Sequence, residues 1–152
     1  MVPSRIHLLT GGLGSGKTAA CLQFLAAGLR GGEPVALITA DYGADLQALG
    51  FYLGVDIRSP VESGQLQILR YRPQFAAAVA TSRSPDRMFD DLRAMLGDRR
   101  PARIAIDPLD PFLSDGGPVN AGSLALVSFL DELGATSLLT TTSDASGTFD
   151  RG

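Results

Sequence analysis

Residues 11–18 constrain this chain more than any other stretch, because they fit the pattern Gly-x-x-x-x-Gly-Lys-[Ser/Thr] at every position. The sequence before them, at 5–10, is typical of a short apolar strand, and the sequence after them, at 18–30, is typical of a helix. A loop between a strand and the start of a helix is the context that this phosphate-binding motif, the P-loop, requires. The sequence therefore predicts a P-loop, and the alternative is a glycine-rich turn with an incidental lysine.

Each residue type in this loop suits phosphate binding. Glycines let several backbone N–H groups turn inward around a phosphate, and the helix start adds unpaired donors and partial positive charge. Lys17 can reach the β and γ phosphates, and the Thr18 hydroxyl is placed to ligate Mg²⁺. Lys17 is the only lysine among 13 basic residues, and arginine is no substitute for lysine at such a site. The predicted nucleotide-binding residues are Gly11, Gly12, Leu13, Gly14, Ser15, Gly16, Lys17, Thr18 and Ala19.

Composition narrows the class of protein. With 152 residues, 45% of them hydrophobic and 19% charged, we expect one globular domain over residues 1–152 with a hydrophobic core. A net charge of −3 gives no support to nucleic-acid binding. The single Cys21 excludes an intramolecular disulfide, and we find neither a signal peptide nor an apolar run long enough to cross a bilayer. We therefore expect a cytoplasmic protein without a membrane partner.

Strand and helix patterns alternate along the chain. Strands are expected at 5–10, 35–40, 65–70, 103–107 and 136–140, and helices at 18–30, 44–54, 85–96 and 121–133. Residues 55–64 and 108–118 are expected to be loops, and 71–83 is either helix or mobile loop. This alternation predicts a three-layer α/β/α sandwich around a mostly parallel five-stranded sheet. The apolar helix faces are expected to contain Leu46, Leu49, Tyr52 and Leu53; Phe89, Leu92, Met95 and Leu96; and Leu124, Val127, Leu130 and Leu133.

Polar residues follow the strands at the edge where ligands bind in open parallel sheets. Asp107 comes after the apolar residues 104–106, which is the pattern of a Walker B carboxylate that holds Mg²⁺ through water beside Thr18. The alternative is that Asp107 only begins the turn at Pro108. The same edge is expected to carry Asp41, Tyr71, Arg72 and residues 140–143.

Two further groups at this edge are candidates for the chemistry. Asp41 follows the second strand and can orient or deprotonate an attacking water, unless it only opens a turn. Thr141 and Thr142 can sense a γ-phosphate by hydrogen bonding, although such hydroxyl clusters are common in turns. The catalytic candidates are therefore Lys17 and Asp41, and the candidate metal ligands are Thr18 and Asp107.

Taken together, the order of these segments resembles the RecA-like ATPases, most closely the KaiC and RadA branch. Similarity covers nearly the whole chain, although Asp41-Tyr42 stands where KaiC-like proteins carry a glutamate pair. The family core has further strands after the one at 136–140, so the resemblance predicts a domain truncated at its C-terminus, a shortened regulatory relative, or a domain completed by a partner. The segments that carry the resemblance are 11–18, 37–39, 62–69, 103–107, 133–136 and 140–142.

The resemblance implies ATP or ADP binding with Mg²⁺, an active site at a subunit interface and often a hexameric ring. The leading hypothesis is an ATPase that drives or regulates an assembly, with itself or with a protein partner. A nucleotide-dependent regulatory module with little hydrolysis is the main alternative. A small-molecule kinase that uses the same P-loop is a third hypothesis, and the acidic net charge gives DNA recombination no support.

Overall fold

The computed structural model describes residues 5–41, 43–71, 85–112 and 121–143. Its sheet contains β1 (Ile6–Gly11), β2 (Val35–Thr39), β3 (Leu66–Arg70), β4 (Arg103–Asp107) and β5 (Thr136–Thr142). All four pairings are parallel, in the spatial order β1-β5-β4-β2-β3. The predicted parallel sheet is confirmed, with β1 and β3 at its two edges.

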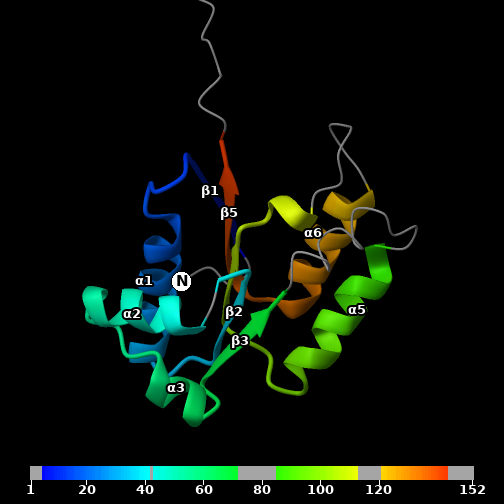
Figure 1. The fold of residues 1–152 in the computed structure, drawn as a ribbon. Helices are drawn as coiled ribbons and strands as arrows, with labels where there is room; N and C mark the ends of the chain where they lie inside the picture. Colours follow the sequence, from blue (N-terminus) through cyan, green and yellow to red (C-terminus); the bar gives the residue numbers. More distant parts are fainter. Residues whose placement is uncertain (1–4, 42, 72–84, 113–120, 144–152) are drawn as a thin grey trace, which may run out of the picture.

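Helices lie on both sides of this sheet. Figure 1 shows α1 (Lys17–Arg30), α2 (Gly43–Leu53) and α3 (Arg58–Glu62) on one side, and α5 (Pro85–Leu96) and α6 (Ala121–Leu133) on the other. A short 3-10 helix, η1 (Asp110–Phe112), follows β4. The three predicted layers are therefore present. No helix in the described ranges has the length and apolar character to span a membrane.

The central strands are buried on both faces, so two cores form. Val35 and Leu37 of β2 pack in one cluster with Leu25 of α1, and Ala36 and Ile38 pack in the other with residues of α5 and α6. This alternation follows from the two-residue period of a strand. It also explains why β2 reads as a continuous apolar run.

The predicted apolar faces of the helices need correction. Leu130 and Leu133 are buried as predicted, but Leu124 and Val127 are exposed, and the buried face of α6 is completed by Leu126 and Phe129. Tyr52 and Met95 are exposed as well, whereas their predicted partners are buried or half-buried. Helical spacing identifies apolar arcs, but only the position of the sheet decides which part of each arc is covered.

Three local predictions about loops and strand ends are also corrected. Helix α3 lies within the stretch predicted as a loop, where Asp56 Oδ1 accepts a hydrogen bond from the Ser59 amide at 3.3 Å. The turn η1 lies in the second predicted loop. Strand β5 continues to Thr142, two residues past its predicted end, because it pairs with β1 as far as Gly11. Residues 72–84, including Arg72, lie outside the described residues.

Phe129→Ala is expected to lower the free energy of unfolding by about 3–5 kcal/mol, because it leaves a cavity in the core between α5, α6 and the sheet. The Phe129 ring is fully buried, its centroid lies 5.2 Å from that of Phe89, and the Arg93 guanidinium lies 5.6 Å from it. Urea denaturation measures the effect. Leu124→Ala on the exposed face of the same helix is the matched control, expected to cost less than ~1 kcal/mol. Equal losses in both variants would mean that the burial assigned to α6 is wrong.

Candidate functional site

The loop between β1 and α1 has the backbone geometry of a phosphate-binding turn. Gly14 and Gly16 have φ angles of 72° and 84°, which residues with a Cβ rarely adopt. Gly16 directly precedes α1, and its carbonyl accepts the helical bond from the Ala20 amide at 2.9 Å. Because α1 begins after Gly16, its first N–H groups have no acceptor within the helix and are available to an anion held by the loop.

Lys17, the first residue of α1, folds back over the loop. Its Nζ donates hydrogen bonds to the carbonyl oxygens of Gly11 and Gly12 at 2.7 Å and 2.8 Å. An ammonium group has three donors, so one N–H remains after these two bonds. The carbonyls hold the ammonium above the loop, where that donor can reach a bound phosphate.

The loop opens into a pocket of about 370 Å³ at the carboxyl edge of the sheet. Asp41, Asp107 and Thr142 line this pocket together with residues 13–19 of the predicted nucleotide-binding stretch, whereas Gly11 and Gly12 do not line it. Leu49 of α2 and Pro108 line it as well, and the sequence did not identify either of them. The complete lining is Leu13, Gly14, Ser15, Gly16, Lys17, Thr18, Ala19, Asp41, Leu49, Asp107, Pro108 and Thr142.

The sheet register explains why these residues meet. Gly11, at the end of β1, pairs with Thr142 of β5, and Asp107, at the end of β4, pairs with Thr39 of β2. Asp41 lies two residues beyond Thr39. Because all strands are parallel, their carboxyl ends reach the same edge. Residues about 130 positions apart in the chain are thereby brought to one pocket.

Asp107 is almost fully buried, with 4% of its surface exposed, and it accepts a hydrogen bond from the Thr140 hydroxyl. Burial and the Asp107 charge raise the pKa of Cys21 to about 12, so the thiol stays protonated and behaves as a small core residue. The hydroxyl of Thr18 and the carboxylate of Asp107 are hard oxygen donors of the kind that Mg²⁺ prefers. Within the described ranges no three His, Cys, Asp or Glu side chains group together as a metal site. With these two donors, Mg²⁺ would take its remaining ligands from phosphate and water.

Asp41 lies half-buried at the edge of the pocket. Its amide donates to the Thr39 hydroxyl at 3.0 Å, which fixes the turn after β2. Burial, and then the charges of Asp107 and Asp45, raise the pKa of the Asp41 carboxyl above its ordinary value. A carboxylate with a raised pKa is a stronger base, which suits the predicted proton transfer.

Asp41→Asn is expected to raise the melting temperature at pH 7 by at most about 2–4 °C, since it removes a repelled and partly desolvated charge. The folded protein binds the Asp41 proton more tightly than the unfolded chain does, because the pKa of this carboxyl is raised above 3.8 on folding. The protonated carboxyl therefore stabilises the fold at low pH, and this contribution is lost as pH rises through the folded pKa. The advantage of the asparagine variant should therefore shrink as pH falls from 7 towards 4. Thermal melts of both proteins across this range measure it, and a gain that does not change with pH would rule out the electrostatic cause.

The other predicted edge residues have different surroundings. The Thr141 hydroxyl donates to Asp110 Oδ1 at 2.7 Å and Thr141 does not line the pocket, so of the two threonines predicted to sense a γ-phosphate only Thr142 lines it. Tyr71 is buried, and its hydroxyl donates to the Pro108 carbonyl at 2.9 Å. Asp110 was not predicted, although its place three residues after Asp107, at the same sheet edge, was a usable signal.

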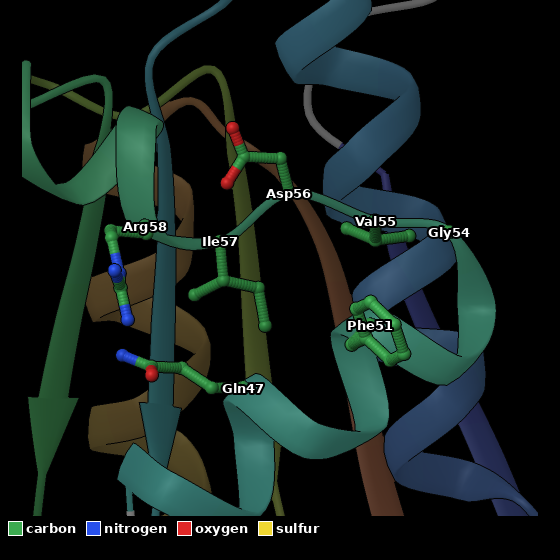
Figure 2. Close-up of a pocket in the computed structure, with 7 residues that line it drawn as sticks. All are labelled: Gln47, Phe51, Gly54, Val55, Asp56, Ile57 and Arg58. Carbon is green, nitrogen blue, oxygen red and sulfur yellow. The ribbon is translucent and has the colours of Figure 1, made fainter.

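A larger hollow of about 470 Å³ lies beside α2, away from the P-loop. Figure 2 shows the Arg58 side chain directed towards Gln47 and the Asp56 carboxylate directed away from Phe51. Phe51, Val55 and Ile57 give this hollow a mainly apolar lining. Its lining lacks the phosphate-binding loop and the paired acidic and hydroxyl groups, so we assign the chemistry to the smaller pocket.

Comparison with known protein families gives one match that covers almost the whole chain. The model of the family described as "ATPase: KaiC" matches residues 1–151. None of the curated proteins that were compared matches this sequence. The match confirms the predicted resemblance to the RecA-like ATPases of the KaiC branch, and the parallel sheet agrees with the fold of that class.

Proposed function

This chain belongs to the KaiC ATPase family, and we propose that it hydrolyses ATP with the help of Mg²⁺. The family makes it an ATP-binding protein of the RecA type. One observation carries the step to hydrolysis: the P-loop, Asp41 and Asp107 line the same pocket. These are the groups that bind the phosphates, hold the metal and activate water in P-loop NTPases.

Each residue has a distinct task in this proposal. The loop amides at the start of α1 bind the α- and β-phosphates, and the free donor of Lys17 binds the γ-phosphate. Thr18 and Asp107 would hold Mg²⁺, Asp107 through water. When bound, the metal neutralises the charge that develops on the phosphate oxygens.

Asp41 is the proposed general base. Its carboxylate accepts a proton from water as the water oxygen bonds to the γ-phosphorus and the bond to the bridging β–γ oxygen breaks. The products are ADP and phosphate. The raised pKa of Asp41 and its place beside the pocket support this role.

Equilibrium binding of ATP and ADP, with and without Mg²⁺, followed by phosphate release from the same samples, tests the proposal. Binding with turnover supports an ATPase. ATP binding without turnover would instead favour the nucleotide-dependent regulatory module, and phosphate transfer to a metabolite would favour a kinase. One observation favours the regulatory module: Asp41 is the single pocket carboxylate that follows β2, and it is half-exposed.

We further propose that this domain acts in the cytoplasm. It assembles either with copies of itself, up to a hexamer, or with a protein partner. Large apolar side chains that are exposed on α2 and on the edge strand β1 support an assembly. Phe51 and Tyr52 of α2 are 90% and 85% exposed, and Leu8 of the edge strand β1 is 59% exposed. Surfaces of this kind commonly mark protein contacts. A role in driving or regulating such an assembly follows from the same proposal.

A further inference from the structure

Asp107, the last residue of β4, and Asp110, three residues later, hold the last three residues of β5. The Thr140 hydroxyl donates to Asp107, and the Thr141 hydroxyl donates to Asp110 Oδ1 at 2.7 Å. The Thr142 amide lies 3.3 Å and 3.2 Å from the two carboxylate oxygens of Asp110. Asp107 lines the nucleotide pocket but Asp110 does not, so Asp110 has no direct place in the proposed chemistry.

The two aspartates act from opposite faces of the sheet. Successive side chains of a strand alternate, and Thr141 shares its face with Leu139, which packs in the core below α6. Thr140 and Thr142 point to the other face, where the P-loop and α1 lie. Asp110 therefore holds Thr142 from behind, through its backbone, while the Thr142 side chain faces the pocket.

Asp110 is itself fixed in place. Its neighbours Leu109 and Phe112 are buried, and the Leu109 amide donates to the Thr140 carbonyl at 2.6 Å. On the other side, the Tyr71 hydroxyl donates to the Pro108 carbonyl at 2.9 Å, and the Tyr71 and Phe112 rings meet edge to face at 5.2 Å. A group held this rigidly can set the position of another residue closely.

We propose that Asp110 is a positioning residue that places Thr142 against the γ-phosphate and so sets the preference of the pocket for ATP over ADP. This inference rests on the proposed function. Asp41, Asp107 and Thr142 line the same pocket as Lys17, at the ends of their strands. A γ-phosphate held by Lys17 would therefore lie close to Thr142. ADP has no group at that place, so Asp110 should affect ATP and leave ADP unaffected.

The test compares Asp110→Ala with wild type by the affinity for ADP and for a non-hydrolysable ATP analogue, both with Mg²⁺. We expect the analogue to bind about tenfold more weakly, as for the loss of one positioned hydrogen bond, and ADP to change less than about twofold. Asp110→Asn keeps one acceptor oxygen, so its affinity for the ATP analogue should fall by only about threefold. Asp131→Ala, an exposed change on α6, is the control and should bind both nucleotides as wild type does.

A Thr142→Val background shows whether Asp110 acts through Thr142. In that background Asp110→Ala should have no further effect on the analogue, because the hydroxyl that it positions is already gone. If the effects of Thr142→Val and Asp110→Ala on analogue affinity add, Asp110 does not act through Thr142 and the inference is overturned. An equal loss of ADP and analogue affinity, together with a lower melting temperature, would show a merely structural role and would overturn it as well. Wild type that binds neither nucleotide would overturn the proposed function itself, whereas wild type that binds both with Asp110→Ala unchanged would overturn this inference alone.

Discussion

Replacing Lys17 with alanine is expected to weaken ATP binding about 100-fold and to abolish phosphate release. Charge-assisted hydrogen bonds contribute about 1.5–3 kcal/mol each, and a loss of ~3 kcal/mol corresponds to about two orders of magnitude in affinity. Lys17 also ties the carbonyls of Gly11 and Gly12 together, so its removal loosens the loop that presents the amides. Titration of a fluorescent ATP analogue and a phosphate-release assay measure the two effects.

Two controls separate the role of Lys17 from a loss of folding or of charge. Arg30→Ala removes a basic residue from the last turn of the same helix, and it should leave binding and turnover unchanged. Lys17→Arg keeps the charge but replaces a compact ammonium with a planar fork, so we expect poor rescue of turnover. Phosphate release that persists in Lys17→Ala would show that the P-loop of this chain is not the source of the activity.

Asp107→Asn is expected to lower phosphate release at least about 100-fold and to remove its stimulation by Mg²⁺. The asparagine keeps the size of the side chain and an oxygen for the Thr140 hydroxyl, but it lacks the charge that attracts a divalent cation. Loss of that charge also removes one cause of the raised pKa of Asp41, which makes Asp41 a weaker base. Both effects act in the same direction on turnover.

The rate of phosphate release measured against Mg²⁺ concentration tests this role. ADP affinity in the absence of Mg²⁺ should change less than about threefold, because the phosphates are then held by the P-loop alone. Asp98→Asn, an exposed change beyond the end of α5, is the matched control. A variant at Asp107 that responds to Mg²⁺ as wild type does would disprove the assignment of Asp107 to the metal.

Much of the fold could be read from local sequence. The P-loop pattern, the buried run at β2 and the apolar residues before Asp107 each depend on a few adjacent residues, so the five strands and helices α1, α2, α5 and α6 were predicted nearly in full, whereas α3 was predicted as a loop. The prediction of buried helix residues was wrong where packing between distant segments decides which side chains are covered. Leu124 and Tyr52 have helical spacing but are exposed, because the spacing does not say how much of each helix the sheet covers.

The sequence by itself determined which groups the proposed chemistry uses: a P-loop with the single lysine of the chain, and aspartates at the ends of apolar strands. Only the tertiary structure decided how these groups meet. Placing β5 between β1 and β4 brings Thr142 beside Gly11 and gives Asp110 its contacts with Thr141 and Thr142. No local pattern encodes this, because the strand order depends on how the crossover connections between distant segments pack on the sheet. Asp110 is therefore an ordinary loop residue in the sequence and a support of the pocket wall in the fold.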